Sequence, residues 1–482
     1  MDRRLGEVVI AILAGLQIVA GLGSVSSAAG VPDSERALTS YLGGELGDSG
    51  TALAGASDGS LYVAGDTSSS FFPSASSVSY IGDPQGSQSN LFIARIDSDG
   101  SLREVAVIGG SDFESLADIS VTSDQVVVVG ATSSSDFPSD PSPKCPEEGC
   151  SLNGFVIAMN RSLESILWAK VVGGSRDDQF TSVYGGRSSV LVAGHTFSDD
   201  FPVRKGLQME RRGKSDFFVL RLDETGRTSR GTYLGGYGAE TFPQIDMVLG
   251  SPVLVGTSTS KAYPSTWKGK SSATGYSRGV VSRLGSSLGS IKQSFLIGAS
   301  GNVAAFSLAA HDGRLYLGGS TSGPWTHQIS GASAFDEGCC DGFLMKVNLR
   351  KQEYSWVRRV GGSSEDQVFS VSLSRATGHI AVGGRTNSSD LQTRDAAQSD
   401  PGSFGCEDSP ACYDGFVARI DSGGRVQTLS YLGGSDFDSV AAISAWNGGF
   451  AATGETSSSD FPIRNAFQSM LLGPRDAFVS AF

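Results

Sequence analysis

The ten residues "SYLGGSDFDS" at 430–439 decide the fold, because near-copies of their double-glycine phrase return seven times along the chain. Two further phrases keep the same period, a phenylalanine phrase such as "DGFVARID" at 414–421 and a glycine–threonine phrase such as "ATGET" at 452–456. The second glycine, or the residue in its place, recurs at intervals of 62 to 72 residues, at Gly44, Gly110, Gly174, Gly236, Ala299, Gly362 and Gly434. Three phrases in phase indicate a repeat protein.

Each repeat contains four short apolar stretches separated by turn residues. The stretch after the double glycine, such as "FSVSLSRATG" at 369–378, is followed by a hairpin signal. Stretches such as "QVVVVG" at 125–130 are continuously apolar, which is typical of strands covered on both faces. Four-stranded sheets packed face to face around an axis supply that environment. The sequence therefore predicts an all-β fold, a seven-bladed β-propeller with four antiparallel strands per blade.

The two ends of the repeat region predict how the ring closes. It begins with a double-glycine strand, "ALTSYLGG" at 37–44, and reaches Phe482 on a phenylalanine strand, "DAFVSAF". If these strands pair, the N-terminal strand completes the last blade as its outermost strand. The alternative is an open solenoid of seven units, which would leave an unpaired edge at both ends.

Composition limits the class of protein and of partner. The chain has 482 residues, 39% apolar and 18% charged, which is enough apolar content to bury a large core. Its 64 glycines are about twice the usual share of roughly 7% and favour short strands joined by tight turns. A formal charge of −13 argues against nucleic acid as a partner, because phosphate binding needs clustered Lys and Arg. Cations or basic surfaces match that charge better.

The N-terminus has the pattern of an export signal. "MDRR" precedes an apolar run from Val8 to Gly23, and "SVSSAAG" then offers cleavage after Ala28 or Ala29. We predict a signal peptide at 1–29, a short linker at 30–37 and the propeller at 38–482; an uncleaved membrane anchor is the alternative. We expect a monomer without a membrane span in its mature chain, secreted, periplasmic or on the cell surface after Sec-type export.

The phrases "YLGGSDFDSVAAI" at 431–443, "ATGETSSSDFP" at 452–462 and "DAFVSAF" at 476–482 resemble the seven-bladed β-propeller (SBBP) repeat. The resemblance spans roughly 38–482 and is weakest in the fourth repeat, with "TSTSKAYP", and the fifth, with "LIGASGN" and "STSGPW". It implies the propeller fold and export in the manner of bacterial surface proteins. It carries no catalytic motif.

Repetition separates framework from candidate site. A residue present in every blade serves what every blade needs, so we interpret the double glycine as backbone geometry, a turn that requires φ > 0 or close approach. In a propeller, the loops that leave the outer strands and the loops between second and third strands emerge on one face. We expect that face to be acidic, through Asp112, Asp136, Asp177, Asp178, Asp199, Asp200, Asp366, Asp436 and Asp460, and through Asp48, Glu114, Glu240 and Asp438 in the same loops.

The acidic face allows three interpretations. It is a solvated surface with Asp as turn former, a site for a divalent cation such as Ca²⁺, or a docking site for a basic partner. No EF-hand or repeat-in-toxin ligand spacing is present, and we assign no metal ligand and no cofactor.

All six cysteines fall between second and third strands: Cys145, Cys150, Cys339, Cys340, Cys406 and Cys412. An even number in an exported chain indicates disulfides, most simply Cys145–Cys150 and Cys406–Cys412. Two alternatives are open for Cys339 and Cys340: they form a vicinal disulfide with each other, or they exchange disulfide partners with the cysteine pair of the adjacent blade. A zinc site is a poorer alternative, because the chain has only four histidines.

The residue before the threonine of the "VAGxT" phrase varies in charge, as expected near a binding site: Asp66, Ala131, His195, Thr257, Ser320, Arg385 and Glu455. The alternative is that these side chains simply reach solvent. His195, with Asp199 and Asp200 close in sequence, is a weak candidate for metal binding or proton transfer.

These features predict a secreted or surface-held binding scaffold for a protein, a glycan or a cation. No sialidase-type Asp box, quinoprotein tryptophan motif, GxSxG elbow or histidine-rich cluster is present, so we expect no enzyme and assign no catalytic residue. An extracellular hydrolase or lyase on the same fold, and a purely structural envelope component, are the alternatives.

Overall fold

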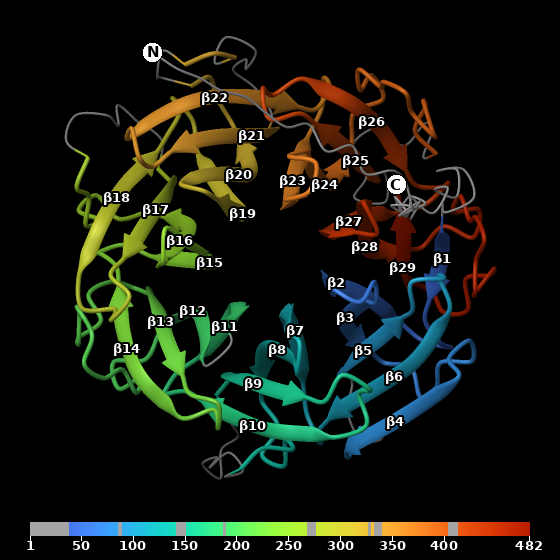
Figure 1. Ribbon diagram of the computed structural model, residues 1–482, viewed down its shortest axis with the longest axis horizontal. Helices are drawn as coiled ribbons and strands as arrows, with labels where there is room; N and C mark the ends of the chain where they lie inside the picture. The colour runs from blue at the N-terminus through green and yellow to red at the C-terminus, as the bar shows by residue number, and fades with distance from the viewer. Residues whose placement is uncertain are drawn as a thin grey trace, which may run out of the picture. The chain divides into compact units, whose positions relative to one another are not determined.

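The computed structural model describes residues 38–84, 89–140, 151–186, 189–267, 276–325, 329–331, 340–402 and 413–482. Every regular element in these ranges is a β-strand, and they contain no helix that is long and apolar enough to cross a membrane. Ala37–Phe482 form one compact unit in which seven sheets stand side by side in a ring (Figure 1). The predicted seven-bladed β-propeller is confirmed.

We number the blades along the chain and give their strands from the centre outward. Blade one has β2 (Asp48–Gly55), β3 (Leu61–Thr67), β5 (Asn90–Ile96), β6 (Leu102–Gly109) and an additional β4 (Ser77–Gly82). Blade two has β7 (Glu114–Val121), β8 (Val126–Thr132), β9 (Asn153–Met159) and β10 (Ile166–Val172). Blade three has β11 (Asp178–Gly185), β12 (Val190–Thr196), β13 (Asp216–Leu222) and β14 (Thr228–Leu234).

Blade four has β15 (Glu240–Val248), β16 (Ser251–Ser258), β17 (Arg278–Leu284) and β18 (Ile291–Ile297). Blade five has β19 (Val303–His311), β20 (Arg314–Thr321), β21 (Asp341–Asn348) and β22 (Glu353–Val360). Blade six has β23 (Asp366–Leu373), β24 (Ile380–Thr386), β25 (Asp414–Ile420) and β26 (Val426–Leu432). Blade seven has β27 (Asp438–Trp446), β28 (Gly449–Thr456), β29 (Asp476–Ala481) and β1 (Thr39–Leu42).

The ring closes as predicted, through the pairing of the first strand with the last. β1 runs antiparallel to β29, with Thr39 opposite Ser480 and Leu42 opposite Ala477. The hydroxyls of Thr39 and Ser480 lie 3.0 Å apart, which ties the two strands through side chains as well. Blade seven is therefore built from both ends of the repeat region.

One strand was not expected. In blade one, β4 pairs in parallel with the outer strand β6 from Ser77↔Glu104 to Gly82↔Gly109, and makes that sheet five-stranded. Its sequence, "SVSYIG", lies in the connection between β3 and β5 and carries none of the repeated phrases. No pattern in the other blades points to it.

The phenylalanine phrase supplies the core between blades. Its phenylalanine is buried in the third strand of six blades, whereas blade four has Val280 there. An aromatic ring from the preceding loop packs on Phe92, Phe155, Phe343 and Phe478. Ring centroids lie 5.4 Å apart for Phe72–Phe92, 5.0 Å for Phe137–Phe155 and 4.7 Å for Phe461–Phe478. The phenylalanine of the "DFP" phrase is thus a core residue, because its ring packs on the sheet.

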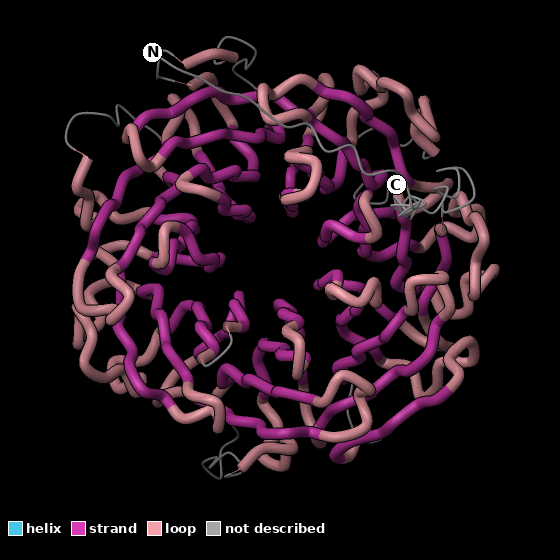
Figure 2. The backbone as a smooth tube through the Cα atoms, viewed as in Figure 1, coloured by secondary structure: helices cyan, strands magenta, loops and turns pink. Residues whose placement is uncertain are grey.

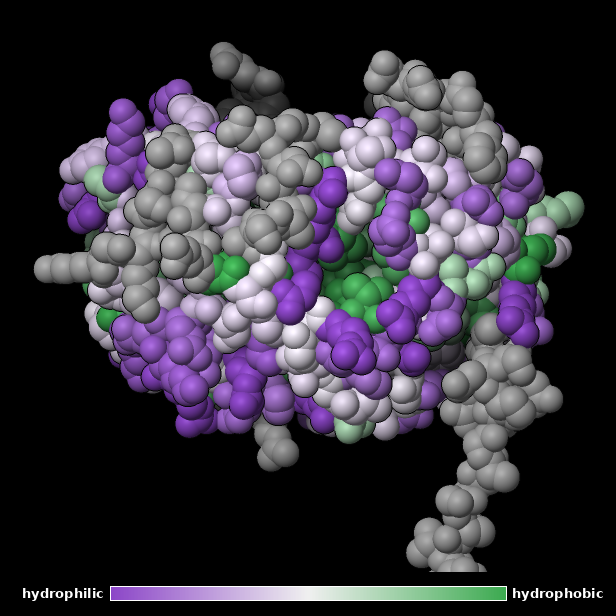
Figure 3. Space-filling view, turned by 90° about the horizontal axis from the view of Figure 1, so that it is seen from above, coloured by the Kyte–Doolittle hydropathy of each residue, from purple (hydrophilic) through white to green (hydrophobic). Residues whose placement is uncertain are grey.

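Strands form the body of the ring around an open centre, and loops are most abundant at its periphery (Figure 2). Seen from the edge, hydrophilic residues dominate the visible surface, and a hydrophobic area lies in a hollow between them (Figure 3). This distribution agrees with a core that lies between adjacent sheets, where seven clusters of buried apolar residues are found.

In blades three, six and seven, a loop segment pairs with the outer strand. Our sequence interpretation did not predict this segment. In "FPVRKGLQ" at 201–208, "LQTRDAAQ" at 391–398 and "FPIRNAFQ" at 461–468, the arginine backbone pairs with the outer strand. The terminal glutamine of each phrase accepts a hydrogen bond from the first glycine of a double glycine. The sequence pattern that could have predicted this segment is a glutamine seven residues after its first residue, a phenylalanine or a leucine, in three blades.

Candidate functional site

The loop face is the side of the ring on which the double-glycine connections and the loops between second and third strands emerge. The two sets of loops lie against each other, as predicted. In blade seven the backbone N–H and the hydroxyl of Ser435 both donate to Asp460 Oδ1, at 2.8 and 3.0 Å. The same contact recurs as Ser111–Asp136, Ser175–Asp200 and Ser363–Asp390.

Six blades contain a buried carboxylate at the first residue of the inner strand, which we call the carboxylate latch. In blade six Asp366 accepts hydrogen bonds from Gly362 N at 2.8 Å, Thr386 Oγ1 at 2.5 Å and Ser388 Oγ at 3.0 Å. The equivalent glycine N–H donates to each of the other five carboxylates, Asp48, Glu114, Asp178, Glu240 and Asp438. The latch explains why the double-glycine phrase is repeated. One hydrogen-bonded unit is formed by the double glycine, the carboxylate four residues after it and the hydroxyl residues of the glycine–threonine phrase.

The glycine in the latch is required by close approach rather than by positive φ. A Cβ on Gly434 would lie 2.4 Å from Asp460 Oδ1 and 2.6 Å from Ser458 Cβ. The glycines with positive φ lie elsewhere, for example Gly100 and Gly424 in the turns between third and fourth strands. We had interpreted the double glycine as a requirement for either positive φ or close approach. The structure supports close approach.

Asp178 and Asp366 do not contribute to an acidic surface, contrary to our expectation. Both side chains are fully buried in latches, because the loop between second and third strands folds over them. Burial raises the pKa of each to about 6, which opposes the hydrogen bonds that stabilise the charge. The same correction applies to Asp48, Glu114, Glu240 and Asp438.

The remaining predicted acidic residues lie on the loop face, but most of them already have partners. Asp136, Asp200 and Asp460 accept the serine hydrogen bonds described above. Asp199 pairs with Arg211 at 2.6 Å, and Asp177 accepts a hydrogen bond from Leu152 N at 3.1 Å. Asp112 and Asp436 are exposed.

The structure bears on the candidate metal site, whereas most of the cysteines lie outside the residues that it describes. Within the described ranges, no group of three or more His, Cys, Asp or Glu side chains is arranged to hold a metal ion. Cys145, Cys150, Cys339, Cys406 and Cys412 lie outside the described residues, and Cys340 is half-buried beside β21. The disulfide pairings remain predictions.

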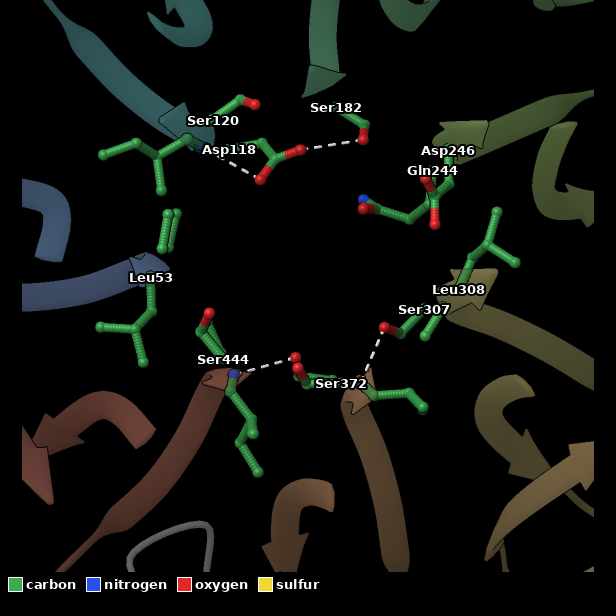
Figure 4. A pocket seen from close by; sticks show the side chains of 18 of the residues that line it. Leu53, Asp118, Ser120, Ser182, Gln244, Asp246, Ser307, Leu308, Ser372 and Ser444 are labelled. Atoms are coloured by element: carbon green, nitrogen blue, oxygen red, sulfur yellow. Dashed lines mark hydrogen bonds between the residues drawn. The ribbon is translucent and has the colours of Figure 1, made fainter. Parts of the chain in front are cut away.

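The seven inner strands surround a central channel with a cavity of about 410 Å³ (Figure 4). Its lining combines hydroxyl, amide and carboxylate groups, among them Ser120, Gln244 and Asp246, with apolar residues such as Leu53 and Leu308. The residues that line the cavity differ from blade to blade.

A belt of hydrogen bonds joins neighbouring inner strands around this channel. A side chain of one blade accepts a hydrogen bond from a backbone N–H of the next blade, at 2.8 to 3.1 Å. The acceptors are Asp118, Ser120, Ser182, Asp246, Ser307, Ser370, Ser372 and Ser444. At the junction of blades one and two, β2 has Ala52 and Ala54, and Asp66 of β3 accepts from Leu116 N instead, at 2.6 Å.

The cavity lining contains two aspartates, Asp118 and Asp246, and one arginine, Arg375. Burial is the main cause that raises the pKa of Asp118 to about 6, and the charge of Asp246 adds to it. Asp246 also has a raised pKa from burial, while the positive charge of Arg375 opposes that rise. The channel therefore holds two carboxylates of blades two and four that ionise less readily than exposed ones.

The variable residue of the "VAGxT" phrase contacts neighbouring loops and blades. Glu455 pairs with Arg475 at 2.9 Å, and Asp66 serves the next blade as described above. His195 is buried between the rings of Phe197 and Phe242, and burial lowers its pKa to about 4. The structure does not bring His195 together with Asp199 and Asp200, which bind Arg211 and Ser175.

Comparison with known proteins adds little to this geometry. No family model matches the chain. A xyloglucanase of Hypocrea jecorina (strain QM6a) is 28% identical over 208 residues, which are 43% of this chain and 22% of that protein's length. The matched stretch thus spans less than a quarter of that relative.

Solved structures resemble the chain in fold at 9% sequence identity. The Dos1 propeller matches 92% of this chain and 95% of its own, with a TM-score of 0.43. The WD40 β-propeller domain of Doa1 matches 92% and 96%, with a TM-score of 0.46. Raptor of Chaetomium thermophilum matches 92% and 30%, with a TM-score of 0.47.

Proposed function

We propose that this protein is an exported binding scaffold that holds its ligand at the loop face and the adjoining mouth of the central channel. The observation that supports it is the division of labour in the blades. Residues that repeat in the blades form the latches, the aromatic core and the strand pairing. Three kinds of position differ from blade to blade: the β-bulge of the inner strand, the channel lining and the variable residue of the "VAGxT" phrase. A ring with one binding site needs this arrangement, since identical blades offer no unique surface.

Export rests on the N-terminal pattern and on the SBBP resemblance. The apolar run at 8–23 and the small residues after it fit a cleaved signal, and the cysteine pairs fit an oxidising compartment. Fractionation of the producing cell, with mass spectrometry of the mature N-terminus, tests both points. A protein that retains its first 29 residues in the cytosol would overturn this part of the proposal.

A glycan is the ligand class that the channel and the loop face favour. Hydroxyl and amide groups line the channel, and aromatic rings such as Phe113, Phe242 and Tyr237 are exposed on the loop face. Polar groups that fix orientation beside aromatic faces are typical of small-ligand sites. A basic protein and a cation are the other members of the proposed class, because the loop face retains exposed carboxylates.

The experiment is a binding panel on the mature protein, with neutral and acidic oligosaccharides, a basic protein and Ca²⁺ as separate probes. Saturable binding to one probe, with a rise in the unfolding temperature by mass action, supports the scaffold. An unchanged unfolding temperature at millimolar Ca²⁺, and after EDTA, removes the cation from the proposal. The absence of binding to every probe favours the purely structural role.

Glycan hydrolysis is a second candidate, favoured by the similarity to the xyloglucanase over 208 residues. Asp118, whose pKa is raised to about 6, has the property of a general acid, and Asp246 is the second channel carboxylate. Hydrolysis of xyloglucan that falls at least about 100-fold in Asp118→Asn would support it. Asp136→Asn on the loop face is the control, and the absence of turnover by the wild-type protein eliminates the candidate.

A further inference from the structure

A row of aromatic rings centred on blade six holds a guanidinium between two of its rings; the row begins at Phe306 in blade five and ends at Phe437 in the connection to blade seven. Starting at the channel, the ring centroids of Phe306 and Phe369 lie 5.7 Å apart. Arg385 Cζ lies 5.5 Å from the centroid of Phe369 and 4.5 Å from that of Tyr413. Phe437 continues the row, 6.4 Å from Tyr413. We call these five residues the blade-six row.

The positions that make this row are the ones that vary around the ring. Phe306 and Phe369 are the bulge residues of β19 and β23, where register shifts by one residue. The bulge residues of four other blades are Thr51, Ala117, Thr181 and Ala441. Arg385 occupies the variable place of the "VAGxT" phrase. Packing needs that are common to all blades therefore do not account for this row.

The five side chains are half-buried, neither sealed in the core nor free in solvent. Phe306 and Phe369 also line the channel cavity, and Tyr413 and Phe437 belong to the loops of the loop face. The row consequently runs from the mouth of the channel outward across the loop face. Clustered aromatic surface of this kind is costly in water unless a ligand covers it.

Arg385 forms no ion pair with a carboxylate in the part of the chain that the structure describes. Its Nε is buried without a hydrogen-bond partner there, and its contacts are the two rings. Blade seven places Glu455 at the same position, and that carboxylate pairs with Arg475 at 2.9 Å. One blade thus completes its ion pair internally, while blade six presents a cation.

The carboxylate that contacts Tyr413 of this row is engaged by neutral donors. Glu365 accepts a hydrogen bond from the Tyr413 hydroxyl at 2.7 Å and another from Gln367 Nε2 at 2.7 Å. These contacts hold Tyr413 in place over the guanidinium. Neither hydrogen bond involves Arg385.

We propose that the blade-six row binds a carboxylate-bearing sugar, such as a hexuronate unit of an acidic oligosaccharide. A planar guanidinium binds a carboxylate through two parallel hydrogen bonds. The negative faces of aromatic rings attract the C–H bonds that a pyranose ring presents on its flat side. This assignment depends on the proposed scaffold function and names its ligand.

The test compares two probes that differ only in charge, an oligogalacturonate of four to six units and the same oligosaccharide with its carboxyl groups reduced. Calorimetric titration of the mature wild-type protein is expected to show tighter binding of the acidic probe, with an affinity that falls as salt is raised. Arg385→Gln is expected to weaken binding of the acidic probe about tenfold or more and to leave the reduced probe unchanged. Arg385→Lys, which keeps the charge without the fork, should give an intermediate loss.

Arg475→Gln is the matched control, because Arg475 lies on the same face but is paired with Glu455. It should bind both probes as the wild-type protein does. Unfolding temperatures of all variants identify any that fail to fold, and Phe369→Leu then serves as a second variant that removes ring contact and weakens both probes. Equal binding of the two probes to wild type and to Arg385→Gln would overturn the assignment and leave a glycan scaffold. No binding of either probe would overturn both the assignment and the glycan as ligand.

Discussion

Blades five and six start their inner strands in different ways. In blade six, three buried donors converge on the carboxylate of Asp366. In blade five the fully buried Val303 takes that position, and the hydroxyl of Thr321 donates to the carbonyl of Gly323 at 2.9 Å. A buried donor is satisfied in both blades, by a carboxylate in one and by a backbone carbonyl in the other.

The exchange in blade five involves the whole unit. Gly323 stands where blade six has Ser388, and Ala299 stands where blade six has Gly362. A Cβ on Gly362 would lie 2.6 Å from the Cβ of Ser388, so the alanine of blade five fits only with the serine gone. The comparison teaches that the glycine, the carboxylate and the serine of a latch change together.

The largest effect is expected from Asp366→Ala. It leaves Gly362 N, Thr386 Oγ1 and Ser388 Oγ buried without their acceptor, and we expect a loss of about 3 kcal/mol or more in the free energy of unfolding. Asp390→Ala, at an exposed aspartate of the same blade, is the control and should cost about 1 kcal/mol or less. Denaturant unfolding measures both, and equal losses would mean that the latch has no special role.

The glycine of the latch gives the next effect. In Gly362→Ala the new Cβ meets Asp390 Oδ1 at 2.2 Å, and we expect a loss of about 2 kcal/mol. Adding Ser388→Gly should recover part of that loss, since it removes the second contact and reproduces two of the three changes of blade five. Strictly additive losses in the double-mutant cycle would contradict the coupling.

A smaller effect is expected from pH. Burial raises the pKa of Asp438 to about 7, above the value of about 3.9 for an unfolded aspartate. The folded state therefore binds more protons between these values, so stability from this group is fully present below about pH 4 and is lost as pH rises through about 7.

Replacing Asp438 by Asn removes that titration. We expect the fall in unfolding free energy between pH 5 and pH 8 to be shallower in Asp438→Asn than in the wild-type protein, by on the order of 1 kcal/mol. Thermal unfolding at both pH values measures it. Val303→Ala in blade five, which has no carboxylate to titrate, should keep the wild-type slope, and an identical slope in all three proteins would show that the latch of blade seven does not titrate in this range.

The smallest effect belongs to the belt around the channel. Ser370→Ala leaves Ile443 N without its acceptor, and we expect a loss of about 1 kcal/mol. Ala54→Ser at the junction of blades one and two, which lacks such an acceptor in β2, is the matched addition and should cost nothing. A larger loss for Ala54→Ser than for Ser370→Ala would mean that the belt hydrogen bonds do not support the ring.

Much of the fold followed from the sequence because it depends on period and strand patterning. The seven blades, the four shared strands and the pairing of β1 with β29 all came from phrases that repeat in phase. The additional β4 did not, since it occurs in one blade only. The latch could have been found, because a carboxylate follows the double glycine by four residues in six blades.

The acidic face was overestimated for the same reason. We took the repeated glycines as framework but treated the repeated carboxylates Asp178 and Asp366 as surface, although repetition argued equally for both. The blade-six row could not be predicted, because it depends on which side chains meet across a bulge. Phe306 and Phe369 are 63 residues apart in sequence, and their rings meet because each stands at the bulge of its inner strand in neighbouring blades.

The closure between β1 and β29 sets an order of events during folding. Thr39 and Ser480 are 441 residues apart in the chain, so the strand that completes the final sheet pairs only after the other blades have brought the two ends together. Until then, both this strand and the edge of the sheet that it completes expose unsatisfied backbone groups. We therefore expect mispairing between chains mainly in the step before closure.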